Sequence, residues 1–255
     1  MKPILILLLW WPVWLLGDDI SRWGSLRELF PEAPQYALAK AVNRNNPKAI
    51  QRAIEAGADV NKPGKHGLSF LVLALLRDNK DSFAYLLERG ANPNIPNDAM
   101  FEAAIFEAAA SEDPWWLARV MEHGGDVNAV HMPGENISEG GTPLFKLVRV
   151  KSATTRALHL KTLLSAGANI NHQNNMGTTV LIESVDYNSN YIFAYELLQA
   201  GADPALKNKY GNTLVYSMTE FTQPAPNSVK GKWREKVVAL LKEKGIDVPP
   251  AKRTH

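Results

Sequence analysis

The chain has 255 residues, 45% of them hydrophobic, and a formal net charge of +2 at pH 7. The apolar share is large enough to build a core, which excludes a disordered protein, and the small net charge gives no reason to expect nucleic acid as a partner. Cysteine is absent, which excludes disulfides, cysteine nucleophiles and thiolate metal sites.

The N-terminal segment has the layout of a secretory signal peptide. Lys2 precedes an apolar stretch, residues 4–16, which ends before Gly17 and two acidic residues. Thirteen helical residues reach about 20 Å, short of a hydrocarbon core of about 30 Å, so a full transmembrane span is the weaker interpretation. The residues before Gly17 form a poor cleavage site. We therefore expect residues 1–17 to be either a signal peptide or an uncleaved anchor that tethers the protein through residues 4–16. A buried N-terminal helix is a third alternative, and residues 18–30 are expected to be a linker or N-terminal cap.

A short Gly-Ala-Asp phrase recurs along the rest of the chain. Its versions lie 33, 34, 43, 34 and 44 residues apart, and they begin at Gly57, Gly90, Gly124, Gly167, Gly201 and Gly245. A nearly constant period of this size indicates a repeat architecture. The two long intervals fit the same unit carrying an insertion of about 10 residues, which loops of such folds tolerate.

The unit at residues 57–90 predicts the content of each repeat. Residues 61–67 are polar and rich in Gly, Pro and Lys, which indicates a turn or hairpin. An apolar segment, residues 68–76, predicts a first helix. The apolar stripe of Phe83, Leu86 and Leu87 then follows the i, i+3, i+4 spacing of a second helix, which Gly90 ends.

This pattern resembles the ankyrin repeat. The family's template has Gly and then Thr-Pro-Leu at the start of the first helix, and paired leucines before the Gly-Ala-Asp phrase. Thr142, Pro143 and Leu144 carry the motif intact. Partial versions include Gly67, Ser69 and Leu71, then Gly177, Thr179 and Leu181, then Gly211 and Thr213, and the leucine pairs are Leu86-Leu87, Leu163-Leu164, Leu197-Leu198 and Leu240-Leu241. A Thr or Ser at this position is expected to cap the first helix.

The resemblance covers residues 31–248 and implies an all-α ankyrin-repeat solenoid of about six helix-turn-helix units with short hairpin loops. Residues 249–255 would form a flexible tail. The third unit departs from the pattern, because it lacks a hairpin glycine and contains Pro93 and Pro96. Two insertions are expected to be loops: a long finger at residues 128–141, and residues 219–233 between the last two helices.

In such a stack, the hairpin tips and first helices form an extended surface on which we expect a protein partner to bind. The candidate contacts in ordinary hairpins are Lys62, Lys65, His66, His172, Gln173, Lys207, Lys209 and Tyr210, and those in the finger are His131, Glu135, Asn136 and Glu139. Trp115 is a further candidate anchor, because one of two adjacent tryptophans must point away from the core stripe. The alternative for the hairpin residues is that they are ordinary solvated loop residues. The alternative for Trp115 is that its ring and that of Trp116 both pack inside the fold.

The sequence does not indicate catalysis. His131 and His172 lack a Ser or Cys partner at a recognisable spacing, and no metal-binding or phosphate-binding motif occurs. We therefore expect no enzyme activity, no cofactor, no metal and no small-molecule substrate.

The signal-peptide layout of residues 1–17 and the absence of cysteine point to a bacterial periplasm, and the ankyrin resemblance implies a binding protein there. Small exported ankyrin proteins of bacteria include immunity proteins that neutralise toxic effectors, among them phospholipases delivered by type VI secretion. The leading hypothesis is an immunity protein that sterically inhibits such an effector. The alternatives are a periplasmic scaffold that supports a host enzyme, and a hydrolytic enzyme.

Overall fold

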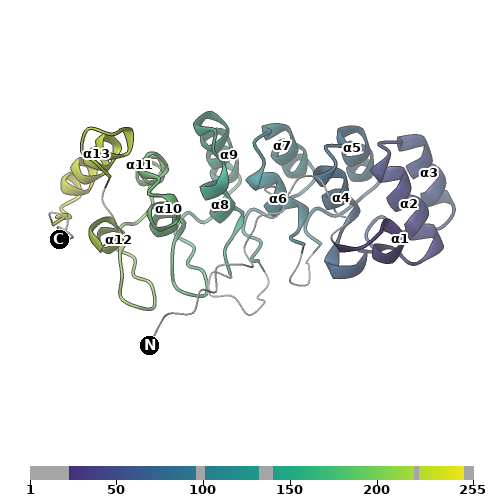
Figure 1. The fold of residues 1–255 in the computed structure, drawn as a ribbon, viewed down its shortest axis with the longest axis horizontal. Helices are drawn as coiled ribbons and strands as arrows, with labels where there is room; N and C mark the ends of the chain where they lie inside the picture. Colours follow the sequence, from purple (N-terminus) through teal and green to yellow (C-terminus); the bar gives the residue numbers. More distant parts are fainter. Residues whose placement is uncertain (1–22, 96–100, 132–139, 221–223, 250–255) are drawn as a thin grey trace. The chain divides into compact units, whose positions relative to one another are not determined.

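The computed structural model describes residues 23–95, 101–131, 140–220 and 224–249 (Figure 1). The predicted leader lies outside these residues, as does all but the first residue of the predicted tail. Within them the secondary structure consists of thirteen α-helices, two short 3₁₀ segments, and an isolated bridge between Gln173 and Thr179 in place of any strand. The all-α prediction is therefore confirmed. None of the described helices has the length and apolar character needed to cross a bilayer.

The chain divides into two compact units, Met1–Phe101 and Glu102–His255. The first unit contains α1 (Leu26–Leu29), α2 (Ala33–Asn43), α3 (Pro47–Glu55), the 3₁₀ segment η3 (Lys65–Gly67), α4 (Phe70–Leu76) and α5 (Lys80–Glu88). Its two helix pairs stack, because α2 packs on α4 and α3 on α5. The short α1 packs beside them, and the ring of Phe30, which follows α1, stacks on Phe70 at a centroid distance of 4.8 Å. Both rings are fully buried, so this segment covers the apolar start of α4.

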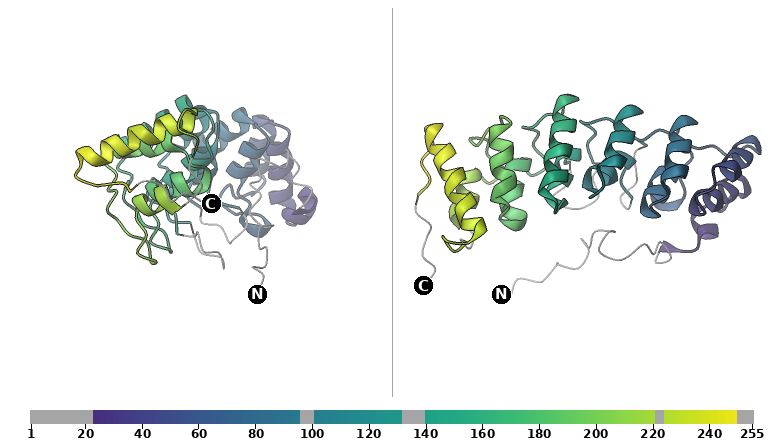
Figure 2. Two further views of the ribbon diagram at one scale, coloured as in Figure 1. Left: turned by 60° about the vertical axis from the view of Figure 1, so that its left-hand side comes forward. Right: turned by 90° about the horizontal axis from the view of Figure 1, so that it is seen from above.

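The second unit contains four helix pairs. They are α6 (Ala104–Ala110) with α7 (Pro114–Glu122), α8 (Pro143–Lys146) and η4 (Leu147–Arg149) with α9 (Ala153–Ser165), α10 (Val180–Asn188) with α11 (Tyr191–Gln199), and α12 (Leu214–Glu220) with α13 (Val229–Glu243). The first helices form one layer, in which α8 packs between α6 and α10, and α10 packs on α12 (Figure 1). The second helices form the other layer and lie side by side in chain order (Figure 2).

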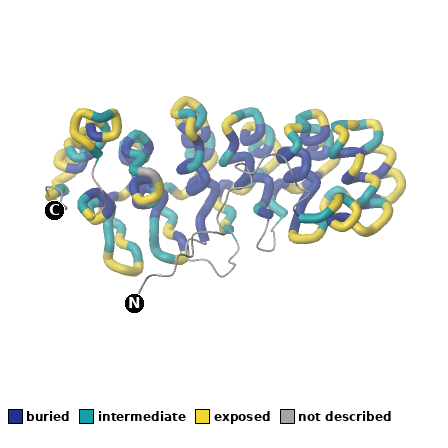
Figure 3. The backbone as a smooth tube through the Cα atoms, in the orientation of Figure 1, coloured by how far each residue is buried: buried dark blue, intermediate teal, exposed yellow. Residues whose placement is uncertain are grey.

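The apolar core lies where the two layers of each unit meet, while hairpin tips and the outer sides of the second helices are exposed (Figure 3). The second leucine of the pair at Leu197-Leu198 is as buried as the first, with 1% of its surface exposed. Burial of each such leucine contributes on the order of 2 kcal/mol to folding. The predicted repeat, with its six helix pairs in the described residues, is thus present in both units.

The recurring Gly-Ala-Asp phrase has a structural explanation at each of its positions. Gly167 follows α9 with a φ of 88°, a left-handed conformation that ends a helix and that L side chains rarely adopt. One phrase earlier, the Asp126 carboxylate accepts a hydrogen bond from the Asn128 backbone N–H at 2.9 Å, which forms an Asx turn. The Asn128 side chain then donates to the Gly167 carbonyl at 3.0 Å and accepts from the Asn169 N–H at 2.9 Å. The glycine therefore ends one repeat, and an asparagine at Asn61, Asn128 and Asn171 bonds the phrase of the following repeat.

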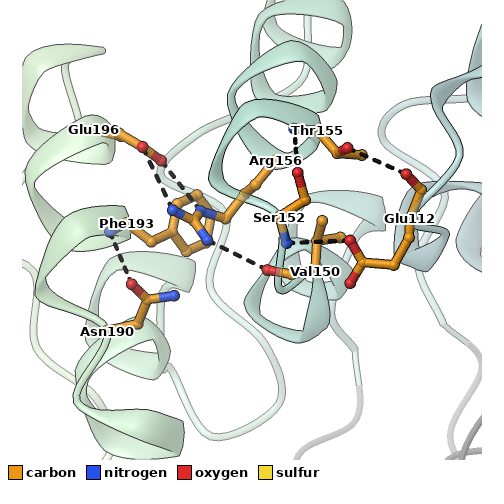
Figure 4. A network of polar contacts seen from close by, with 8 residues as sticks. All are labelled: Glu112, Val150, Ser152, Thr155, Arg156, Asn190, Phe193 and Glu196. Atoms are coloured by element: carbon orange, nitrogen blue, oxygen red, sulfur yellow. Dashed lines mark hydrogen bonds and ion pairs between the residues drawn. The ribbon is translucent and has the colours of Figure 1, made fainter.

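A polar network joins three consecutive repeats on the second-helix side of this unit (Figure 4). Glu112, in the turn before α7, accepts hydrogen bonds from the backbone N–H groups of Lys151 and Ser152 at 2.7 and 3.1 Å. The guanidinium of the buried Arg156 reaches the other way, to Glu196 on α11, where Nε lies 3.2 Å from the carboxylate. It also donates to the Val150 carbonyl at 3.3 Å. These contacts satisfy the start of α9 and fix its position between its neighbours.

Two expectations about local structure are corrected. Thr142 does not cap α8, because its hydroxyl is buried with no hydrogen-bond partner in the described chain, whereas Thr179 caps α10 through the Ile182 N–H at 3.3 Å. The insertion at residues 219–233 is a shorter loop than expected, because the Ser228 hydroxyl caps the Gly231 N–H at 3.0 Å and α13 begins at Val229.

The asparagine contact between repeats is open to a direct test. The substitution Asn128→Ala removes two inter-repeat hydrogen bonds, so we expect it to lower the free energy of unfolding by about 1–3 kcal/mol in a urea titration. The matched control is Asn227→Ala in an exposed loop, which should be neutral. Equal stability of the two variants would contradict the role assigned to the phrase.

Candidate partner-binding face

Charged residues occur at equivalent positions of consecutive first helices in the second unit. Lys146 and Glu183 stand three residues after the first residue of α8 and α10, and Arg149 and Asp186 stand six residues after it. Residues three apart lie on the same face of a helix, and α8 packs on α10. With Glu102, these four residues form what we call the charged row.

The row begins at an ion pair in front of α6. The Glu102 carboxylate bonds the Lys146 ammonium, and the His131 Nδ1 lies 3.4 Å from the same carboxylate. Their side chains are 15%, 9% and 21% exposed, respectively, so all three are largely removed from water. Burial alone would raise the pKa of Glu102, but Lys146 and His131 outweigh it and lower the pKa. The carboxylate is therefore charged at neutral pH.

The row continues onto α10 with two acids, Glu183 and Asp186, whose burial is less fully offset by neighbouring positive charges than that of Glu102. Burial raises the pKa of Glu183 to about 7, although the nearby charges of Lys146 and Arg149 act in the opposite direction. Desolvation also raises the pKa of Asp186, whose carboxyl accepts a hydrogen bond from Ser217 on α12 that partly offsets the rise. The next residue, Tyr187, has 49% of its surface exposed. This face thus carries two acids whose burial in the charged form costs folding free energy, and an exposed aromatic side chain.

The long finger starts and ends beside the row. The His131 backbone N–H donates to the Gly141 carbonyl at 2.9 Å, and the His131 ring lies edge-on to Phe106 at a centroid distance of 6.0 Å. Three predicted contact residues of the finger, Glu135, Asn136 and Glu139, lie outside the described residues. The described base of the finger, at His131, lies next to Glu102.

The predicted contact residues of the later hairpins differ in exposure. His172 is half-buried, and its Nε2 donates to the Gly140 carbonyl at 2.7 Å, so its ring joins two hairpins. The Gln173 amide donates to the carbonyls of Gly177 and Lys207 at 2.6 and 2.9 Å. Lys207 and Lys209 are exposed, as is Tyr210, with 71% of its surface accessible. The partner role of these residues stays a prediction.

The remaining predicted residues lie elsewhere. Lys62, Lys65 and His66 are exposed in a hairpin of the first unit, where the Lys62 ammonium pairs with Glu32 at 2.7 Å. Trp115 is half-buried at the start of α7. Its ring packs edge-on against the buried Trp116 at 4.9 Å, and the Arg119 guanidinium lies 5.6 Å from its centroid. The anchor role of Trp115 also stays a prediction.

Sequence reasoning missed the charged row, although the sequence contained a signal for it. Alignment of the repeats by their helix starts would have placed Lys146 beside Glu183, and Arg149 beside Asp186. The same alignment assigns Leu73 and Leu76 of α4 to these positions in the first unit, and both are buried there. The polar character of this face is therefore a property of the second unit and not of every repeat.

The raised pKa of Glu183 predicts a pH-dependent stability. A carboxyl whose pKa is higher in the folded state stabilises the fold fully below pH 4.5, and this contribution is lost as the pH rises through about 7. Glu183→Gln imitates the protonated group. We expect it to raise the free energy of unfolding by on the order of 1–3 kcal/mol at pH 8 and to have little effect at pH 4.5. Glu235→Gln, at an exposed position of α13, is the control. A benefit of equal size at both pH values would contradict the assignment.

Comparison with known proteins agrees with this architecture. No family model matches the chain. A crystal structure of an ankyrin repeat domain from Acinetobacter baumannii superposes with a TM-score of 0.64 at 24% identity, over 84% of this chain and 100% of that one. A second solved ankyrin repeat protein gives a TM-score of 0.59 at 23% identity, over 80% and 96% of the two chains.

Curated relatives match at the level of sequence. Human mitochondrial disaggregase is 26% identical over 212 residues, which are 81% of this chain and 28% of that protein. An ankyrin repeat protein of Acanthamoeba polyphaga mimivirus is 26% identical over 176 residues, which are 65% of this chain and 25% of that protein. The chain thus spans about a quarter of the length of these relatives. With its stacked helix pairs, glycine-ended second helices and these structural neighbours, the chain has the ankyrin-repeat fold.

Proposed function

We propose that the chain binds a protein partner through the charged row and the hairpins beside it. The observation that carries this proposal is the placement of ionisable residues at equivalent positions of the stacked helices α8 and α10, where burial raises the pKa of the half-buried Glu183 to about 7. Packing alone would favour apolar residues here, as at Leu73 and Leu76 of the first unit. Ionisable groups that a fold retains at such a cost are concentrated at functional sites.

Binding, and not catalysis, is the activity that this arrangement supports. Stacked repeats present extended surfaces suited to macromolecules, and the ankyrin-repeat fold is typically a non-enzymatic interaction scaffold. The disaggregase activity named for the human relative does not extend to this chain in our proposal, because the match covers only 28% of that protein.

For the biological role, we propose an exported immunity protein that occludes the active site of a cognate toxic effector, such as a phospholipase delivered by type VI secretion. The signal-peptide layout of residues 1–17 supports export to the periplasm. The finger predicted at residues 128–141 supports a steric mechanism, because long loops in compact domains tend to be functional and the described residue His131 at its base lies beside the row. A periplasmic scaffold that supports a host enzyme is the competing role, and the two roles differ in what happens to the partner's activity.

Charge reversal on the binding face tests the proposal. Asp186 and Lys209 are exposed, so the double variant Asp186→Lys with Lys209→Glu should fold normally and keep the net charge. We expect it to weaken binding at least tenfold, by about 1.4 kcal/mol or more, in calorimetric titration against the partner purified from the native host. The control is Lys161→Glu, at an exposed position of α9 in the other helix layer.

The activity of the partner separates the two roles in the same experiment. Stoichiometric loss of its hydrolytic activity on addition of the chain is the result expected for an immunity protein, whereas a scaffold would leave that activity intact. Unchanged affinity of the double variant would contradict the proposed face.

Export is tested separately from binding. We expect a fusion of residues 1–24 to a periplasm-dependent reporter to be active, because Lys2 and the apolar stretch at residues 4–16 direct secretion. The matched control replaces Leu7 and Leu8 by Arg, which interrupts the apolar stretch. A reporter that stays in the cytosol with both leaders would exclude the periplasmic role.

A further inference from the structure

A small pocket opens on the second-helix side of the last two repeats, outside the charged row. It lies between the starts of α11 and α13, which pack side by side (Figure 1). Its volume is about 170 Å³, and most of its lining is apolar and comes from Tyr191, Ile192, Val229 and Trp233. The polar part of the lining comes from Ser189, Asn190 and Lys230. An apolar cavity of about 150 Å³ accommodates benzene, so this pocket has room for one leucine- or phenylalanine-sized side chain.

The apolar groups at this pocket remain accessible. Val229 has 69% of its surface exposed, although it lines the pocket. The Trp233 ring is half-buried and fixed in place, because Tyr195 packs edge-on against it at a centroid distance of 5.5 Å. An exposed valine beside a held tryptophan forms a preformed apolar contact surface of the kind found at the centres of protein interfaces.

The surroundings of the pocket are basic. Helix α13 contains five Lys or Arg residues and two Glu residues, an excess larger than the +2 of the whole chain. Lys232 and Lys236 follow Val229 by three and seven residues, so with Trp233 they form one stripe along the helix. The Lys236 ammonium lies 3.9 Å from the Trp233 ring centroid, which places a positive charge directly beside the apolar lining. The starts of α11 and α13 both line the pocket, and helix N-termini add partial positive charge.

We propose that this pocket, the α11–α13 pocket, docks an acidic segment of a protein partner. One large apolar side chain of the segment enters the pocket, and the carboxylates that flank it pair with Lys232 and Lys236. Charge complementarity selects this occupant, because the rim is basic while the lining is apolar. The site uses the opposite helix layer from the charged row, so it would provide a second contact and does not depend on the proposed inhibitory role.

The geometry favours a peptide segment over an anionic membrane. Membrane-bound surfaces insert protruding apolar side chains into the lipid, with aromatic rings at the headgroup level. Here the aromatic ring of Trp233 is packed against Tyr195 and covered by the Lys236 ammonium. Apart from the exposed Val229, the apolar lining is recessed between two helices. A recess of this kind receives a side chain instead of inserting one.

Fluorescence anisotropy with labelled peptides tests the proposal on the full chain. Three probes are hexapeptides of Glu and Asp with one central residue replaced by Leu, Phe or Gly. A fourth probe has the central Leu but contains Lys in place of every Glu and Asp. We expect the Leu and Phe acidic probes to bind at least tenfold more tightly than the Gly probe and the basic probe. Vesicles of phosphatidylglycerol and phosphatidylcholine serve as the competing surface in a flotation assay.

Two variants connect binding to the pocket. Lys232→Glu with Lys236→Glu should weaken binding of the Leu probe at least tenfold, and Val229→Asp should do the same, because an exposed position at the start of a helix tolerates Asp without loss of fold. The control Lys161→Glu should stay within twofold of the unmodified chain, and circular dichroism should show equal helix content for all variants. The proposal would be overturned if the acidic apolar probes did not bind, or if these variants left their affinity unchanged. It would also be overturned if the chain floated with anionic vesicles and the same variants abolished that flotation.

Discussion

Each helix pair of this chain depends on its neighbour, because two short helices cannot bury the apolar stripes that they carry. Stability in such a fold is approximately the sum of weak individual repeats and strong contacts between them. The asparagine at the end of two of these phrases contributes to those contacts by bonding two backbone groups of the following repeat, as Asn61 does at Gly90 and Asn92 and Asn128 does at Gly167 and Asn169. Arg156 and Glu112 add polar contacts of the same kind across three repeats of the second unit. The core and these hydrogen bonds together fix the spacing of the first helices.

The fixed spacing of the first helices in the second unit brings their charged residues together on one face. Because α8 and α10 stack in register, residues at equivalent positions meet, and Lys146 lies close enough to Glu183 to influence its pKa. The row contains compensated charges at one end, where Glu102 is paired, and less compensated acids at the other. A surface of this kind costs folding free energy in the isolated chain. A partner that supplies the missing charges would recover part of that cost on binding.

The sequence predicts most of the fold, for reasons that are visible in single residues. Left-handed glycines such as Gly167 end helices, leucine pairs mark buried stripes, and Ser69 and Thr179 cap helices as expected. The predictions of the cap of α8 and of the start of α13 were wrong, because two local sequence signals compete at each of these helix starts. Thr142 precedes Pro143 at the first position of α8, and its hydroxyl does not cap that helix. Ser228 starts α13 earlier than the proline-rich insertion suggested.

The charged row was harder to predict than the helices. In the sequence alone, Lys146 and Glu183 each look like an ordinary polar residue on an amphipathic helix. Their meaning comes from stacking, because only neighbouring repeats bring Lys146 beside Glu102 and place Ser217 beside Asp186. The α11–α13 pocket is similar, since its lining comes from the starts of two helices, at Tyr191 and Val229, that are far apart in the chain.

A structure of the chain in complex with the partner purified from its native host would test the central claim most directly. The account predicts partner atoms within about 4 Å of Glu183 and Asp186, with first-helix residues of the second unit buried in the interface. A partner bound entirely on the second-helix layer, with the charged row still open to solvent, would contradict it.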